Sequence, residues 1–234
     1  LMAYVLLFVP QPVLDAPRLG TFQYHPSLLP AHRGPSSINW PIAMGKTRTG
    51  LTIFWPDEGL DEGPILIQKS VEIGPDETLG DVYFKKLFPM GVDAMMEGLD
   101  LVKAGVMLKH KQDLAAGSYE SWFKKDLAEL DWSKPVADVY NTIRAANPAP
   151  GAWTTLKGAK LDIYDAARTS GSGKPGEVIA ISDGGITIAG NGGAILAKRV
   201  KAPDTKKIGA AEWAKSVGLA VGDVCSAPQP KASA

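Results

Sequence analysis

Two short polar segments, each at the end of an apolar run, carry residues suited to proton transfer. In TFQYHPSL the apolar run delivers His25 to a turn that contains Pro26. The segment FWPDEGLDEGPIL contains several carboxylates before Gly63. One of them is Asp61, 36 positions after His25. A carboxylate close to an imidazole can raise its pKa, hold its tautomer and prepare it to move a proton. His25 and Asp61 are therefore the first candidates for catalysis.

Plainer interpretations of the same residues stay open at this point. A single histidine at a strand end is more often structural than catalytic, and the acidic segment also fits a solvated turn. The histidines lack a metal-ligand spacing such as HExxH, and the single cysteine, Cys225, provides no cysteine pair. No metal site is therefore predicted.

The elements that would position these residues follow from hydrophobic periodicity. We expect strands over 1–8, 20–25, 50–55 and 65–72, and helices over 10–16, 36–44 and 76–104. Asp76 is the expected N-cap of the long helix, and Pro89 should kink or interrupt it. Strands that alternate with helices predict an α/β architecture with a sheet that is at least partly parallel or mixed.

The pattern changes after Pro148, where short strands alternate with Gly-rich turns at a spacing typical of a small barrel. Helices are expected over 135–146 and 210–217. We predict a catalytic domain over 1–110, a linker over 111–131, a barrel domain over 132–226 and a disordered tail over 227–234. The opening run LMAYVLLFVP resembles a central strand with nothing before it, so the sheet is expected to lack its first strands.

Composition limits the function classes further. The 45% of apolar residues is enough for a buried core, and the opening apolar run is too short to cross a bilayer. One cysteine excludes a disulfide framework and favours a reducing compartment, so a cytoplasmic location without membrane partners is expected. Net charge is zero, but acidic residues predominate up to residue 131 and basic residues predominate after it.

Basic residues of the second half are candidates for binding a polyanion, although solvated surface charge explains them equally well. They are Lys198, Arg199, Lys201, Lys206 and Lys207. Arg33 is interpreted first as a surface arginine and second as a contact for an anionic group. GSGKPG lacks the spacing of a phosphate-binding loop, and GNGG is better explained as a hairpin turn.

Three segments together resemble the folate-dependent formyltransferase family, which includes methionyl-tRNA formyltransferases and the hydrolase domain of 10-formyltetrahydrofolate dehydrogenase. They are HPSLLPAHRGPSSINW, TGLTIFWPDEGLDEGPIL and LDWSKPVADVYNTIRAANPAPGAWT. The resemblance implies a formyltransferase-type, Rossmann-like α/β sheet domain that lacks its first strands. It also implies a small, open, OB-like β-barrel at the C-terminal side.

The resemblance also implies roles for three residues. His25 would contact the oxyanion and transfer a proton, and Asp61 would orient His25 and hold an ordered water. The family usually has an asparagine two residues before the histidine, where this chain has Gln23. Gln23 carries its amide one methylene further out, and a lost oxyanion donor typically costs about 100-fold to 1000-fold in turnover.

The co-substrate that the resemblance implies is 10-formyltetrahydrofolate, without a metal. Its pterin would meet backbone groups along two segments, which comprise Tyr4, Val5, Leu6, Leu7, Phe8, Trp55, Asp57 and Gly59. The first of these segments is otherwise explained as a core strand.

The function expected from the resemblance is formyl transfer from 10-formyltetrahydrofolate to an amine, first of all methionyl-tRNA, with initiator tRNA bound through the basic second half. Hydrolysis of the same donor to tetrahydrofolate and formate is the alternative. The Trp-containing stretches INW and IFW favour it. A non-catalytic folate- or RNA-binding remnant is the third hypothesis.

Overall fold

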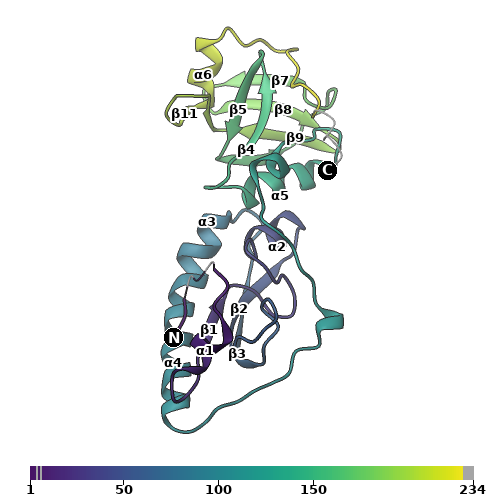
Figure 1. Cartoon of the computed structure of the whole chain (residues 1–234). Helices are drawn as coiled ribbons and strands as arrows, with labels where there is room; N and C mark the ends of the chain where they lie inside the picture. The colour runs from purple at the N-terminus through teal and green to yellow at the C-terminus, as the bar shows by residue number, and fades with distance from the viewer. Residues whose placement is uncertain (4, 6, 229–234) are drawn as a thin grey trace. The chain divides into compact units, whose positions relative to one another are not determined.

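The computed structural model describes residues 1–3, 5 and 7–228, and it divides into two compact units. Unit 1 comprises residues 1–41 and 46–122, and unit 2 comprises residues 42–45 and the described residues from 123 onward. Each unit has its own sheets and helices (Figure 1). The tail predicted over 227–234 lies outside the described residues from position 229 onward.

Unit 1 is built on a three-stranded sheet in the order β1-β2-β3. Its strands are β1 (Gln23–His25), β2 (Arg48–Phe54) and β3 (Ile65–Glu72), and both pairings are antiparallel. The expected parallel or mixed sheet is therefore wrong for the named strands, because β2 and β3 form a hairpin around the acidic loop. The expected strand over 1–8 is also wrong in the part that is described, where only Met2 forms a single parallel bridge, to Gln23.

The described residues of unit 1 also form helices and a π-helical turn on or beside the sheet. They are α1 (Gln11–Asp15), α3 (Leu79–Val82), the π-helical turn η1 (Tyr83–Leu87) and α4 (Phe88–Lys103). The long helix begins after Thr78 and not after Asp76, because Thr78 and Asp81 form a capping box. Pro89 is the second residue of α4, two positions after the π-helical turn ends at Leu87, so the expected interruption is confirmed beside the residue that lacks an N–H donor.

The core of unit 1 lies between α4 and the sheet (Figure 1). Small residues of α4, among them Gly91 and Gly98, are buried against the strands. A Cβ atom at Gly91 would lie 2.7 Å from the ring of Tyr24, so glycine is what lets the helix approach β1. Burial of Phe22 and Leu66 beside these glycines fixes the inner face of the sheet and hence the direction of its strand ends.

After α4 the chain returns along unit 1 on the side away from that helix, with one short 3-10 turn, η2 (Leu114–Ala116) (Figure 1). Backbone bridges of His110 with Ile65 and of Tyr119 with Arg33 are among the contacts that tie it to the unit. The first part of the segment expected as a linker is thus attached to the sheet domain.

Unit 2 contains two four-stranded antiparallel sheets and three short helices. The sheets have the orders β11-β10-β5-β4 and β6-β9-β8-β7. Helix α2 (Asn39–Ala43) ends in this unit, and α5 (Val136–Ala145) and α6 (Ala210–Ser216) lie where helices were expected. A 3-10 turn, η3 (Lys125–Ala128), precedes α5.

The strands of unit 2 are short and joined largely by hairpins, as the spacing of turns predicted. They are β4 (Ala152–Leu156), β5 (Ala159–Ile163), β6 (Ala166–Thr169), β7 (Val178–Ser182), β8 (Gly185–Gly190), β9 (Gly193–Ala197), β10 (Arg199–Lys201) and β11 (Ile208–Gly209). Gly190 pairs with Gly193, which confirms GNGG as a hairpin turn.

Candidate active site

The two residues predicted to act together lie side by side. His25 is the last residue of β1, and Asp61 lies in the loop between β2 and β3. The distance from His25 Nδ1 to Asp61 Oδ2 is 3.6 Å, and both side chains are at least nine-tenths buried. An imidazole and a carboxylate that are 36 positions apart in sequence therefore meet in one buried site.

The other ring nitrogen of His25 faces a backbone carbonyl. His25 Nε2 is 3.0 Å from the carbonyl oxygen of His32, which can only accept a hydrogen bond. Nε2 must therefore carry the proton and donate it, so in the neutral ring Nδ1 has the free lone pair and faces Asp61.

Burial and charge act in opposite directions on His25. Burial lowers the pKa of His25 below its ordinary value, and it outweighs Asp61 and the hydrogen bond to His32, which both act to raise it. The imidazole is accordingly neutral at pH 7, and Asp61 is placed to stabilise the cation that forms when Nδ1 takes up a proton.

Asp61 is held in an uncommon backbone conformation. Its φ of 57° lies in the left-handed region, which Asp and Asn tolerate better than most residues. Its carboxylate accepts a hydrogen bond from the backbone N–H of Gly34 at 2.9 Å. The amide of Gln112 donates to the carbonyls of Asp61 and Gly63 at 3.0 and 2.7 Å. A Cβ atom at Gly63 would lie 1.8 Å from the carbonyl oxygen of Trp55, so only glycine fits there.

The turn that follows His25 is bound to the sheet through a buried threonine of β2. The hydroxyl of Thr52 donates to the carbonyl of Ser27 at 2.7 Å and accepts from the backbone N–H of Leu29 at 3.1 Å. The amide of Gln68 on β3 donates both to Thr52 Oγ1 at 3.0 Å and to the carbonyl of Leu29 at 2.8 Å. Thr52 thus connects the strand to the turn and sets the direction in which the turn leaves the sheet.

The far end of the turn is bound by residues of the returning segment. His32 Nδ1 lies 3.1 Å from Glu120 Oε2, and the backbone N–H of His32 donates to Ser118 Oγ at 2.9 Å. Arg33 is ion-paired with Glu62 and its side chain is only 14% exposed. Arg33 is therefore not a fully solvated surface arginine, because its guanidinium is mostly covered and ion-paired with Glu62.

Gln23 lies on β1 two residues before His25, on the same strand face by the alternation of side chains. It is half-buried and pairs with Phe54 across the sheet. Its amide makes no hydrogen bond to another residue among those described. Its role as the third catalytic group stays a prediction.

The residues expected to meet a pterin lie in different surroundings. The side chain of Trp55 is in the core, edge-on to Phe22 at 5.8 Å between ring centroids, and its backbone N–H donates to Pro64. Asp57 Oδ1 accepts from the backbone N–H of Gly59 at 3.0 Å.

In the opening segment, Val5 is half-buried, and Leu7 and Phe8 are 82% and 69% exposed. These two side chains are therefore not the core residues that a buried strand requires. Tyr4 and Leu6 lie outside the described residues.

Sequence reasoning missed the residues that hold the reactive pair in place. These residues belong to no motif in their local sequence, and their hydrogen bonds span up to 88 positions. They are Thr52, Gln68, Gln112, Ser118 and Glu120. A single sequence contains no signal for such pairings, because periodicity reports only the local element.

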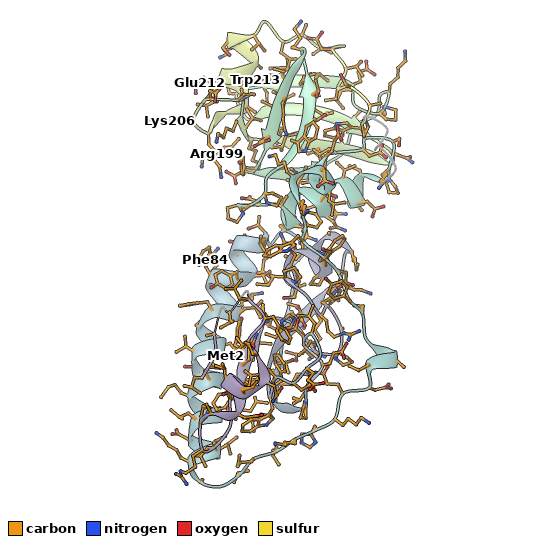
Figure 2. The ribbon with its side chains drawn as sticks, in the orientation of Figure 1. Met2, Phe84, Arg199, Lys206, Glu212 and Trp213 are labelled. Atoms are coloured by element: carbon orange, nitrogen blue, oxygen red, sulfur yellow. The ribbon has the colours of Figure 1, made fainter. Side chains whose placement is uncertain are left out.

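The basic residues of unit 2 gather around β10. Lys198, Arg199, Lys206 and Lys207 are exposed and Lys201 is half-buried; Arg199 and Lys206 project from the same side of the unit (Figure 2). Acidic groups interrupt the cluster, since Asp165 lies 3.7 Å from Arg199. Lys207 lies 3.4 Å from the ring centroid of Tyr164, and burial lowers its pKa despite the opposing charge of Asp165.

No group of three or more His, Cys, Asp or Glu side chains in the described part of the chain has the arrangement of a metal site. No helix within 1–3, 5 and 7–228 has the length and apolar character needed to span a membrane.

The sequence is similar to family models and to proteins of known name. The family model described as formyl transferase matches residues 1–97, and the model of the formyl transferase C-terminal domain matches residues 123–218. Methionyl-tRNA formyltransferase of Syntrophus aciditrophicus (strain SB) is 37% identical over 218 residues, which is 92% of this chain and 70% of that protein.

Mitochondrial 10-formyltetrahydrofolate dehydrogenase of Mus musculus is 36% identical over 216 residues, which is 88% of this chain. The chain spans only 23% of that protein's length.

Solved structures resemble the fold at lower sequence identity. HypX from Aquifex aeolicus, in complex with tetrahydrofolic acid, has a TM-score of 0.77 at 21% identity and covers 94% of this chain and 39% of its own. An N-formyltransferase from Helicobacter canadensis has a TM-score of 0.63 at 22% identity, covering 75% of this chain and 65% of its own. With its mixed α/β fold and two matched domains, the chain belongs to the formyl transferase family.

Proposed function

We propose that this chain transfers the formyl group of 10-formyltetrahydrofolate to an amine, with the amino group of methionyl-tRNA as the first acceptor. The buried pair of His25 and Asp61, with 3.6 Å between Nδ1 and Oδ2, is the observation that carries the proposal. Membership of the formyl transferase family supports folate as the formyl carrier, and the relative from Syntrophus supports methionyl-tRNA as the acceptor.

The chemistry follows from the state of the two side chains. The acceptor nitrogen attacks the formyl carbon, which becomes tetrahedral and carries an oxyanion. Neutral His25 takes the proton of the attacking amine at Nδ1, and Asp61 stabilises the imidazolium that results. The imidazolium then protonates N10 of the folate as the bond from carbon to N10 breaks, which releases tetrahydrofolate and restores the neutral ring.

The oxyanion needs a donor besides the imidazolium. Gln23 shares a strand face with His25, and its amide has no competing hydrogen bond among the described residues. We assign it to the oxyanion, with the extra methylene as a reason for turnover slower than in a relative with asparagine there. The pterin would be bound by backbone groups of residues 4–8 and of Trp55, Asp57 and Gly59, and an initiator tRNA by the basic residues around β10.

Hydrolysis of the same donor is the second candidate. The observation in its favour is the 36% identity to 10-formyltetrahydrofolate dehydrogenases together with the replacement of asparagine by Gln23. Water would take the place of the amine, and His25 would remove its proton in the same way, with Asp61 holding that water. The products would be formate and tetrahydrofolate.

One assay separates these functions. The protein is incubated with 10-formyltetrahydrofolate in the presence and absence of charged initiator tRNA, and tetrahydrofolate release is followed. Release that requires the tRNA supports transfer, and release without any acceptor supports hydrolysis. If the protein binds 10-formyltetrahydrofolate but releases nothing in either mixture, hydrolysis and transfer to methionyl-tRNA are both excluded, which leaves another amine acceptor or a non-catalytic binding function.

The finer architecture belongs to the same proposal. The α/β unit would correspond to the Rossmann-like sheet of formyltransferases, and the two sheets of unit 2 to an open OB-like barrel. The family-model matches to residues 1–97 and 123–218 support both assignments.

A further inference from the structure

His32 contacts His25 through its backbone carbonyl and the returning segment through its side chain and backbone N–H. Its carbonyl accepts the hydrogen bond of His25 Nε2, and its side chain and backbone N–H are held by Glu120 and Ser118. Its φ of 57° is in the left-handed region, which is uncommon for a residue with a side chain. Contacts with the surrounding residues must therefore stabilise this backbone conformation of His32.

The segment that holds His32 makes a set of contacts with the turn. The backbone of Arg33 donates to Ser118 at 3.0 Å and accepts from Glu120 at 3.1 Å, which makes the parallel bridge between Arg33 and Tyr119. The backbone N–H of Ser118 donates to Pro30 at 3.1 Å. A Cβ atom at Gly117 would lie 2.5 Å from the carbonyl oxygen of Pro30, so the segment packs directly on the turn.

We propose that His32 is a positioning residue for His25, and that Ser118 and Glu120 hold it so that its carbonyl fixes the Nε2-protonated tautomer. Deepening the proposed function, the inference makes Nδ1 the only ring nitrogen able to exchange a proton with a substrate. The carbonyl of His32 has no hydrogen to donate, so in the other neutral tautomer its lone pairs would face the lone pair of Nε2. Nδ1 would then already carry a proton and could not take one from a substrate.

The charged groups around His25 come from three parts of unit 1. Asp61 faces it from the loop between β2 and β3, His32 from its own turn, and Glu120 lies behind His32 on the returning segment. The Arg33 and Glu62 pair lies next to these groups in sequence. If the hydrogen bonds of Glu120 and Ser118 to His32 are lost, water reaches the imidazole of His25. The effect of burial then weakens, and the pKa of His25 rises toward its ordinary value.

The test is a double variant, Ser118→Ala with Glu120→Gln, examined by ¹⁵N NMR of the His25 ring. The wild-type chain should have Nε2 protonated at neutral pH, and the variant should have a mixture of the two tautomers. The acidic limb of its rate profile should move to higher pH. Turnover should fall about tenfold with little change in KM, by analogy with the lower end of what hydrogen-bond partners of metal-ligating histidines contribute.

Controls separate positioning from loss of structure. Glu97→Gln removes the same kind of group from an ion pair with Lys69 and should leave tautomer, pH profile and turnover unchanged. If the double variant does not fold, Ser118→Ala alone removes one hydrogen bond and gives the same readout. An unchanged tautomer and an unchanged pH profile in a folded variant would overturn the inference.

The NMR result does not depend on activity. If His25→Ala retains full turnover, the proposed catalytic role fails, while the tautomer of His25 in the Ser118 and Glu120 variants still decides whether His32 positions it.

Discussion

The turn of unit 1 from His25 to Gly34 and the β8–β9 hairpin of unit 2 are held in different ways. The hairpin is closed by pairs between neighbours in sequence, from Gly190 with Gly193 to Ile186 with Ala197. The turn is held by side chains from β2, β3, the acidic loop and the returning segment. Local pairing is thus enough to hold the β8–β9 hairpin, whereas the position of His25 depends on polar contacts with residues that are distant in sequence.

The largest expected effect on turnover is that of replacing His25, the first residue of the turn. Replacing His25 by Ala removes the proposed acid and base, so turnover of 10-formyltetrahydrofolate should fall by about 100-fold to 10,000-fold. His110→Ala, at an exposed histidine, is the matched control and should retain turnover. Circular dichroism checks that both variants are folded. Full activity in His25→Ala would contradict the proposed catalytic role of His25.

Asp61→Asn should have the next largest effect. An asparagine tolerates the left-handed conformation and its amide oxygen still accepts from Gly34, but the charge that stabilises the imidazolium is lost. We expect about 100-fold lower turnover, in the range of general acid–base effects. The pKa of His25 should fall further, because Asp61 acts to raise it.

That pKa is measured by NMR titration of the His25 ring. Asp93→Asn on α4 is the control for the loss of an exposed carboxylate. A pKa of His25 that stays constant in Asp61→Asn would contradict the pairing.

Two buried threonines compare the units directly. Thr52→Val leaves the carbonyl of Ser27 and the N–H of Leu29 without a partner, so unfolding of unit 1 should become easier by about 3 kcal/mol. Thr154→Val loses the hydrogen bond from Trp132 and should cost unit 2 about 1 kcal/mol. Urea denaturation with probes in each unit measures both free energies. Equal losses would break the comparison.

The smallest effect is a pH dependence of stability. The pKa of His25 is lower in the folded chain than its ordinary value, so between these two values the unfolded chain binds a proton that the folded chain does not. Stability is complete above the ordinary value and falls as pH drops toward the folded-state pKa.

The slope should reach at most about 1.4 kcal/mol per pH unit. Denaturation of wild-type and His25→Gln chains at several pH values measures it. The same slope in both chains would show that another group is responsible.

The sequence alone predicted most of what is local. The hairpin turn at 190–193, helix α5 and strand β3 follow from periodicity and turn residues. The pairing of His25 with Asp61 was predicted from two motifs, and the structure brings them together. In the described part of 1–8 only Met2 bridges another strand, because apolar content does not specify a partner strand. The N-cap is Thr78 and not Asp76, because the Thr78 side chain accepts the N–H of Asp81 in a capping box.

What could not be predicted is the set of polar contacts to the turn. Gln112 and Ser118 lie in a stretch with no period, and a residue without a pattern gives no indication of its partner. The conformation of His32 and Asp61 with positive φ was missed for the same reason, since the distant contacts determine it.

The returning segment between α4 and the second unit has one 3-10 turn, and its residues 104–111 and 113–116 are exposed. Exposed segments outside a sheet open locally well before a sheet does. Amide protons of Arg33 and Gly34 should therefore exchange with solvent together with that segment and faster than those of β2. Mild denaturant would then switch off the histidine while the sheet is still intact.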